Sequence, residues 1–303
     1  MLEDQHNVKA WFYLAPALVL LSLFIFYPIV NAFFLSFLDN YNYVRDTFDG
    51  FTLTKNFQNA VTHPDFRWAF QNTAIITFVA VPVSVMLSLL ISAWLNGIKK
   101  FQGFFQTVFF LPYVTNAIAV GMAFAFLFNR QYGLINEFLG LFGVNPINWV
   151  GEGASYPQAV TALIIYIVWL DMAFKILVFL SGLQGISQQY YEAARVDSAS
   201  RVRIFRRITI PLLSPMILYI TVTSFIGAFK AYTQVIGMFG VDLGPKGDPN
   251  QLITVVGVVY QNLGRPEADG AFSEAAATSL ILFAVTLIFT LLNFQVSKKR
   301  VHY

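Results

Sequence analysis

The 303-residue sequence has no cysteine, only three histidines and few charged residues. Without cysteine the chain cannot form a disulfide framework, a thiolate nucleophile or a cysteine-ligated metal site. The histidines, His6, His63 and His302, are far apart and lie outside the apolar stretches, so they suggest no metal site. Charged residues make up 12% of the chain, whereas a soluble domain averages about 25%. This low charge content favours a polytopic membrane protein.

Motifs for phosphate binding and for hydrolysis are also absent. The sequence contains no GxxxxGK[ST] stretch, so we do not expect the chain to hydrolyse ATP by itself. It contains no HExxH motif and suggests no Ser/His/Asp set. The net charge of +3 is small and sits in particular loops, which argues against nucleic-acid binding. We therefore expect a chain that is not an enzyme and holds no cofactor or metal of its own.

Apolar residues dominate, at 57% of the chain, and they form six long stretches. Each stretch has about 20 residues or more, which is enough to cross a hydrocarbon core of about 30 Å. The first is too long for a signal-peptide core and lacks a convincing cleavage site, so we expect it to stay in the protein. The sequence thus predicts an all-α transmembrane domain over residues 1–303. Its expected helices cover about 11–37, 72–95, 104–128, 159–181, 212–238 and 275–296.

Lysine and arginine are unevenly distributed between the loops. With the N-terminus in the cytoplasm, the termini and loops on that side carry 11 of these residues, while the longer loops on the opposite side carry 6. The positive-inside rule therefore predicts a multi-pass protein with both termini in the cytoplasm. Aromatic residues are frequent in the outer loops, where they could anchor the protein at the membrane interface or dock an external protein.

The loop at 187–210 is the most basic segment between two apolar stretches. Ser187 and Ser198 are candidates to cap two short helices, since a serine hydroxyl can accept from a free backbone N–H. Pro211 then interrupts the helical hydrogen-bond pattern where the next apolar stretch begins. The positive charges could do no more than fix the topology. They belong to Arg195, Arg201, Arg203, Arg206 and Arg207.

The order of residues in this loop resembles the EAA loop of the permease subunits of binding-protein-dependent ABC importers. Ser198 stands where that family usually has glycine. The opening WFYLAPALVLLSLFIFYPIVNAFFLSF and the tail EAAATSLILFAVTLIFTLLNF resemble the carbohydrate-uptake branch, which includes the larger maltose permease and related sugar permeases. The family's Gly-Gly-Pro loop has only a degenerate match, GVDLGPKGDPN. The loop positions that carry the resemblance are Glu192, Ala193, Ala194, Asp197, Ala199, Phe205, Ile208, Pro211 and Pro215.

The resemblance implies the type I ABC importer permease fold and ATP-driven import of a sugar or oligosaccharide by alternating access. The implied partners are a second permease of similar fold, two ATPase subunits that bind ATP and Mg, and an extracytoplasmic sugar-binding protein. The implied location is the plasma membrane of a bacterium or archaeon. The residues implied to couple to an ATPase are Glu192, Ala193, Ala194, Asp197, Ser198, Ala199, Phe205 and Pro211.

Three ionisable residues lie within the apolar stretches: Asp171, Lys175 and Lys230. A charge at membrane depth is costly, so each should face a cavity, a partner or the interior of the helix bundle. Asp171 and Lys175 are four residues apart and could simply pair on one helix face. Alternatively, they line a substrate path. The resemblance places five residues on such a path: Asp171, Phe174, Ser224, Ala228 and Ala231. Of these, Ala228 and Ala231 stand where the relative has amide side chains. We add Lys175 and Lys230.

The main alternative is a secondary transporter or channel that works alone. Such a protein would need coupling-ion sites and commonly contains an inverted repeat. The sequence shows no repeat and only one acidic residue within the apolar stretches. Both features favour the importer permease.

Overall fold

The computed structural model describes residues 3–98 and 102–297. Its described elements are helices, apart from one two-stranded sheet, which confirms the all-α class. They fall into two compact units, which we describe one at a time. The first unit contains the residues up to Phe66 together with Val258–Phe283. The second contains Arg67–Gly257 and the residues from Ala284 onward.

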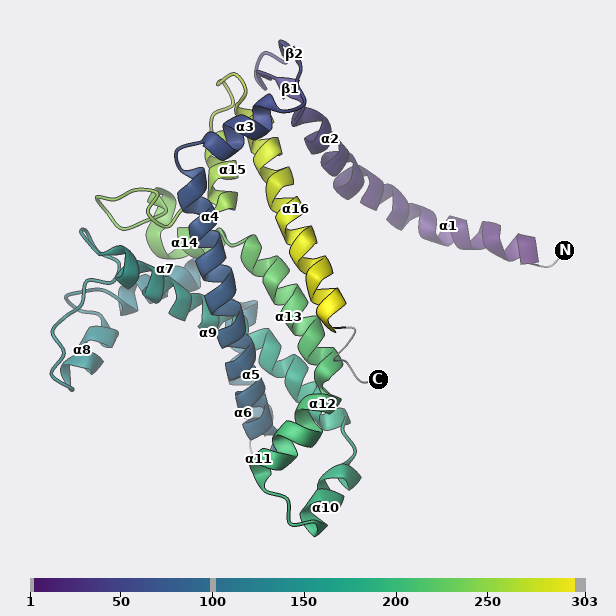
Figure 1. Cartoon of the computed structure of the whole chain (residues 1–303), viewed down its shortest axis with the longest axis vertical. Helices are drawn as coiled ribbons and strands as arrows, with labels where there is room; N and C mark the ends of the chain where they lie inside the picture. Colours follow the sequence, from purple (N-terminus) through teal and green to yellow (C-terminus); the bar gives the residue numbers. More distant parts are fainter. Residues whose placement is uncertain (1–2, 99–101, 298–303) are drawn as a thin grey trace. The chain divides into compact units, whose positions relative to one another are not determined.

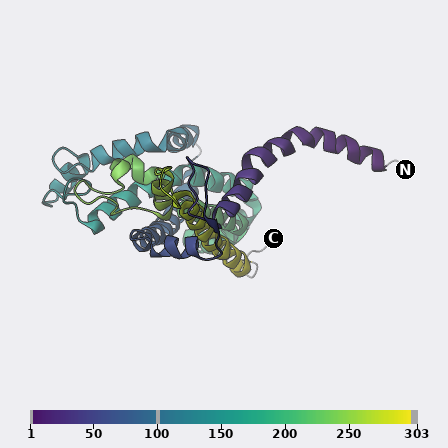
Figure 2. The same cartoon turned by 90° about the horizontal axis from the view of Figure 1, so that it is seen from above.

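The first unit begins with one long curved helical stretch, visible in Figure 2. It consists of α1 (Glu3–Leu21), the π-helical η1 (Ser22–Phe26) and α2 (Tyr27–Leu35). The part at Lys9–Leu35 is long and apolar enough to cross a membrane, and its most apolar window has no buried residue. Its apolar side chains suit a lipid environment.

A small hairpin follows α2, formed by β1 (Leu38–Asp39) and β2 (Gly50–Phe51). The strands are antiparallel, with Leu38 opposite Phe51. Behind them lies α3 (Lys55–Thr62), whose buried Asn56 donates to the Leu38 carbonyl at 2.8 Å. This side-chain hydrogen bond satisfies a backbone group that so short a sheet cannot pair.

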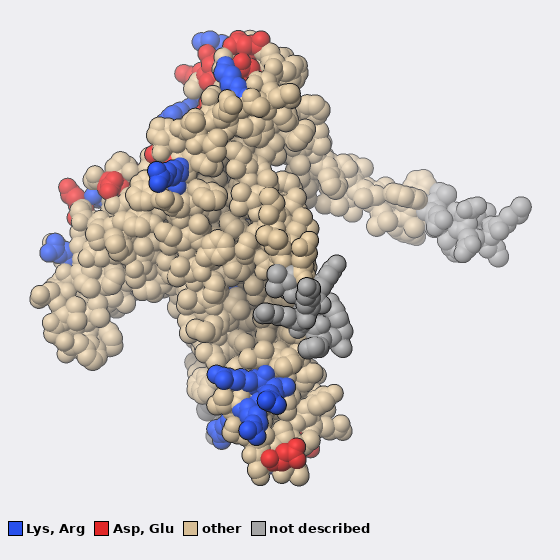
Figure 3. Space-filling view, viewed as in Figure 1, with Lys and Arg blue, Asp and Glu red and all other residues tan. Residues whose placement is uncertain are grey.

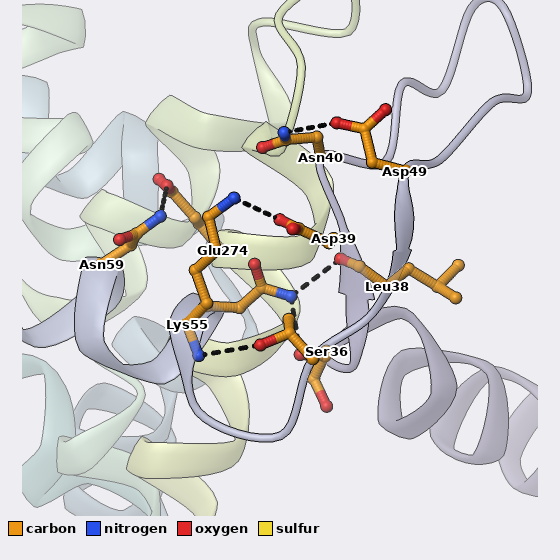
Figure 4. Close-up of polar contacts among 10 residues, drawn as sticks. Ser36, Leu38, Asp39, Asn40, Asp49, Lys55, Asn59 and Glu274 are labelled. Carbon is orange, nitrogen blue, oxygen red and sulfur yellow. Dashed lines mark hydrogen bonds and ion pairs between the residues drawn. The ribbon is translucent and has the colours of Figure 1, made fainter.

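Figure 4 shows two further polar contacts of α3. The Lys55 ammonium lies 2.7 Å from the Asp39 carboxylate, and Asn59 donates to Glu274 at 3.0 Å. Glu274 belongs to the first turns of α16 (Ala271–Ser297). These contacts hold the hairpin and both helices together within the first unit.

The second unit is built around α9, which packs along α5 in its most extensive helix contact (Figure 1). Leu95, Ile176 and Leu180 form one core cluster of this contact. A second cluster contains Val81 and Phe225. The helices of this unit are α4 (Phe66–Ile75), η2 (Ile76–Ala80), α5 (Val81–Asn96), α6 (Gln102–Val114), α7 (Ala117–Leu127), α8 (Leu134–Gly140), α9 (Tyr156–Gly185), α10 (Gln188–Val196), α11 (Arg201–Ile204), η3 (Phe205–Thr209), α12 (Ile210–Leu212), α13 (Ser214–Phe229), α14 (Thr233–Phe239) and η4 (Gly240–Asp242). The remaining helices, α15 (Val255–Leu263) and α16, contribute residues to both units.

Four described helices are long and apolar enough to cross a membrane, and two bent helix pairs bring the number to six. Six is the expected number if each bent pair is one span. The expected arrangement as a single domain over 1–303 stays a prediction. The four continuous spans are Lys9–Leu35, Phe66–Asn96, Tyr156–Gly185 and Ala271–Gln295.

The helix expected at 104–128 is broken in the structure. Its two halves, Gly103–Val114 and Ala117–Leu127, meet at an angle of 101°. Asn116 at the break has an extended backbone, and its side chain accepts from the Ile118 N–H at 2.8 Å. Such a cap starts a new helix. Apolar composition alone could not reveal the break.

The helix expected at 212–238 also differs, since α13 ends at Phe229 and α14 begins only at Thr233. The short α14 packs against α7 where two glycines meet. A Cβ on Gly121 would lie 2.6 Å from the backbone of Gly237, so only glycine permits this approach. The sequence is apolar up to residue 238 because α14 packs against other helices, not because it extends α13.

Three π-helical stretches share one cause. Each ends two residues before a proline: η1 before Pro28, η2 before Pro82 and η3 before Pro211. A proline has no N–H and its ring clashes with the carbonyl four residues earlier. The wider π-turn makes room for the ring, so the helix continues across the proline.

The turn between α10 and α11 differs from the expected one. Ser198 has a φ of 54°, in the left-handed region, and does not cap α11. That cap is Ser200, whose hydroxyl accepts from the Arg203 N–H at 3.3 Å. Two backbone hydrogen bonds, from Ser198 to Arg195 and from Ala199 to Ala194, form a Schellman motif. Ser198 therefore occupies the position of this motif that favours glycine.

We predict that the stability of this turn follows the residue at position 198 in the order Gly, Asn, Ser, Val. Glycine should stabilise the protein by about 1 kcal/mol, because a left-handed conformation costs an L-residue roughly 1–2 kcal/mol. Valine should destabilise it by a similar amount, since a β-branched side chain is strained at positive φ. Thermal unfolding of the purified importer with each variant measures the order. A Ser198→Val protein as stable as the wild type would contradict it.

Candidate functional site

A cavity of about 510 Å³ lies in the second unit, lined by residues of η2, α6, α7, α9, α13 and α14 and by Thr115 and Ala231 beside them. Six of the seven residues expected on the substrate path line it: Asp171, Phe174, Lys175, Ser224, Ala228 and Ala231. They come from two parts of the chain some 50 residues apart, which the fold brings to one space. Their role in binding stays a prediction.

Lys175 is the most deeply buried charged residue of this cavity. Its side chain is 6% exposed, whereas that of Asp171 is 30% exposed. The Lys175 ammonium donates to the Ser84 hydroxyl at 2.6 Å and to the Asp171 carboxylate at 3.3 Å. The expected pairing on one helix turn is present, and it leaves part of the carboxylate facing the cavity. The pair can therefore be structural and still offer an acceptor to a ligand.

An aromatic pair forms another part of the cavity. The ring of Tyr113, from α6, stacks on Phe174 with centroids 5.2 Å apart and planes at 23°. Polar side chains complete the lining at Thr115, Thr223 and Gln234. A flat aromatic face beside carboxylate, hydroxyl and amide groups can bind a ligand that has both apolar faces and hydroxyls.

Lys230 does not belong to this lining. It is exposed and follows the last residue of α13. Sequence reasoning placed it inside a helix because the apolar stretch continues beyond it. The structure thus separates Lys230 from the other residues of the expected path.

Sequence reasoning missed two groups that matter at the cavity. Ser84 is 91 residues away from Lys175 in the chain, and Tyr113 comes from a helix that was not expected to break nearby. The sequence signal for this break is Pro112 followed by Asn116, which caps the next helix, and it could have located Tyr113.

The expected coupling loop lies at one end of the second unit, where Figure 1 shows α10 and α11. Ser187 caps α10, as expected, with its hydroxyl 3.4 Å from the Gln189 nitrogen. Glu192 and Ala193 are exposed on this helix, Asp197 is exposed directly after it, and Ala194 is buried.

The rest of the loop packs behind α10. The hydroxyls of Tyr191 and Thr209 are 3.3 Å apart, which connects α10 to η3. Phe205 and Ala199 are half-buried, and Pro211 stands in the first turn of α12. The structure therefore presents one short exposed helix with a firm support, and the coupling role of its residues stays a prediction.

Comparisons with known proteins show the family to which the chain belongs. The family described as "Binding-protein-dependent transport system inner membrane component" matches residues 84–299. The chain is 30% identical over 302 residues to the lactose transport system permease protein of Rhizobium radiobacter, which covers 99% of this chain and 97% of that protein. It is 28% identical over 285 residues to the trehalose/maltose transport system permease protein of Thermococcus litoralis, covering 94% and 92%.

A solved structure shares the fold. It is that of a bacterial ABC transporter involved in the import of the acidic polysaccharide alginate, with a TM-score of 0.76 and 19% identity over 98% of this chain and 97% of that one. This similarity supports the permease fold. Since the family match extends over well more than half of the sequence, the chain belongs to the inner membrane components of binding-protein-dependent transport systems, the permease subunits of ABC importers.

Proposed function

We propose that this permease carries a sugar or oligosaccharide, and that the cavity beside Asp171 is part of its path. The observation that carries this proposal is the stacked pair Tyr113–Phe174 next to a partly exposed carboxylate. Sugars have apolar C–H faces that pack on aromatic rings, and their hydroxyls require hydrogen-bond partners. Relatives of the chain include permeases of lactose, trehalose/maltose and arabinooligosaccharide transport systems, which supports the same substrate class.

The side chains that contact the ligand should differ from those of the larger maltose permease. Ala228 and Ala231 line the cavity where the resemblance implies amides. In their place Gln234 and Thr223 supply polar groups. This exchange favours a ligand of different shape within the same class.

The partners follow from membership of a binding-protein-dependent family. We assign to the complete importer a second permease of similar fold, two ATPase subunits that hold ATP and Mg, and an extracytoplasmic sugar-binding protein. A structure of the alginate transporter in complex with its periplasmic protein, bound to an alginate pentasaccharide, supports such an assembly. Membership of this family also argues against the alternative interpretation, a secondary transporter or channel that works alone.

The orientation rests on the charge distribution. Both termini and α10 belong on the cytoplasmic side of a bacterial or archaeal plasma membrane, because the loops assigned to that side are the more basic. There Glu192, Ala193 and Asp197 can contact an ATPase subunit. Figure 3 shows basic side chains gathered on this end of the second unit.

ATP-dependent uptake by the complete importer in proteoliposomes tests the substrate class. Labelled oligosaccharides should accumulate, and an amino acid or glycerol phosphate should not. Uptake of a non-carbohydrate solute alone would overturn the sugar proposal.

We predict that Glu192→Lys uncouples ATP hydrolysis from uptake, while the importer still reaches the membrane. Glu192 is exposed on α10, where its carboxylate can meet a basic group of the ATPase. The matched control is Glu137→Lys, a charge reversal in α8 on the side expected to be external. Sugar uptake and ATP hydrolysis are measured on the same preparation. Normal uptake by the Glu192 variant would remove this residue from the coupling set.

We predict that Asp171→Asn lowers sugar uptake at least tenfold, a loss of about 1.4 kcal/mol, and changes the sugar preference. It should destabilise the protein by about 1–3 kcal/mol, because Lys175 keeps its acceptors but loses its counter-ion. The double variant Asp171→Asn with Lys175→Met should recover stability without uptake. Thermal unfolding and uptake are measured for both proteins. Full recovery of uptake by the double variant would show that Asp171 serves only to neutralise Lys175.

A further inference from the structure

The segment 201–212 is one short helical arm in the second unit, made of α11, η3 and α12. It meets α13 at an angle of 70°. Spanning helices tilt by about 20° on average from the membrane normal. With α13 crossing the bilayer, the arm therefore lies nearer to the membrane plane than to its normal.

The arm carries a cluster of cations without acidic partners. Arg201, Arg203, Arg206 and Arg207 are all exposed. Among the described residues, the ion pairs are formed by Lys55 with Asp39 and by Lys175 with Asp171, and neither includes an arginine of the arm. Figure 3 shows these positive side chains as a group over α11. The charge of the group is thus available to an external anion.

Apolar side chains stand next to these cations. Val202 is 62% exposed and Leu212 is 44% exposed, one near each end of the arm. Phe205 and Ile208, between them, are half-buried. A short helix that exposes arginines and apolar residues together and lies along a membrane plane has the chemistry of an interfacial helix.

We propose that the arm 201–212 is a binding site for the headgroups of anionic phospholipids. Each arginine offers several N–H donors in a planar fork that fits a phosphate. Negative lipid surfaces attract such clusters when they lie directly beside a membrane span. The bound headgroups would hold the arm flat on the bilayer.

The site also bears on the position of α10. Tyr191 contacts Thr209 at 3.3 Å, and Thr209 is buried within the arm. A groove of about 470 Å³ between α10 and the arm is lined by Ala194 on one side and Ile208 on the other. Lipid bound to the arm therefore holds in place the segment against which α10 packs. This inference requires α13 to span the bilayer and does not depend on which solute is carried.

The test uses the complete importer in nanodiscs of pure phosphatidylcholine and of phosphatidylcholine with about 30% phosphatidylglycerol, an anionic fraction chosen to give a negative surface. The variant is Arg203→Gln/Arg206→Gln/Arg207→Gln. The matched control is Arg45→Gln/Arg130→Gln/Lys246→Gln, which removes the same charge at exposed positions in loops expected on the opposite side. Bound phosphatidylglycerol is measured by mass spectrometry, and ATP hydrolysis is measured in both lipid mixtures.

We expect wild type and control to bind phosphatidylglycerol and to hydrolyse ATP faster in its presence. The arginine variant should lose binding by about fivefold for each arginine removed, with a loss of the lipid effect on hydrolysis. A lysine version, Arg203→Lys/Arg206→Lys/Arg207→Lys, should retain binding and so shows that the arm still folds.

Two results would overturn the proposal. The first is phosphatidylglycerol binding by the arginine-to-glutamine variant equal to that of the control. The second is failure of this variant to assemble with the ATPase subunits in pure phosphatidylcholine, which would assign the arginines to a protein partner.

Discussion

The buried ammonium of Lys175 is the interaction on which the proposed site depends. It lies between α9 and α5 with the Ser84 hydroxyl at 2.6 Å and the Asp171 carboxylate at 3.3 Å. An unpaired charge in this place would be costly, so both acceptors must stay where they are. The small side chains of Ser84 and Ser88 are fully buried on α5 and let it approach α9 closely. The same contact that packs α5 against α9 therefore also fixes the orientation of Asp171 toward the cavity.

The sequence predicted six membrane helices, the number that the described residues give if each bent pair is one span, because long apolar stretches are a direct signal of bilayer burial. It failed where burial against protein replaces burial in lipid. The apolar run up to residue 238 predicts one helix, although α13 ends at Phe229 and α14 packs against α7 through Gly121 and Gly237. Lipid-facing and protein-facing residues are equally apolar in a membrane protein, so composition cannot separate them. The cues were local: the capping Asn116 and the glycines on facing helices.

The turn after α10 shows a different limit. Sequence reasoning expected Ser198 to act through its hydroxyl, because serine is a good helix cap. The structure gives that role to Ser200 and places Ser198 at a positive φ, where its backbone and not its side chain decides the geometry. Asp171 and Lys175 could be predicted because an acid and a base four residues apart are rare in an apolar stretch. The resemblance to the permease family supplied Phe174, Ser224, Ala228 and Ala231, so these cavity residues could also be predicted. Their partners Ser84 and Tyr113 could not, since contacts between distant parts of the chain leave no periodic trace in the sequence.

The position of α10 explains how a contact at one end of the second unit can reach the cavity. Through Ser187 and Ile186 it follows directly on α9, which carries Asp171 and Lys175. Through Tyr191 and Thr209 it is also tied to η3, which continues by α12 into α13 and Ser224. Both helices that supply most of the cavity lining thus end at the same short helix. Because helices are stiff along their axes and the break at Leu213 is a single residue, a displacement of α10 relative to the membrane must be absorbed at this break or passed to the cavity. In the proposed coupling of α10 to an ATPase subunit, the 70° bend at Leu213 is the point where a movement of α10 would change the distance between α9 and α13.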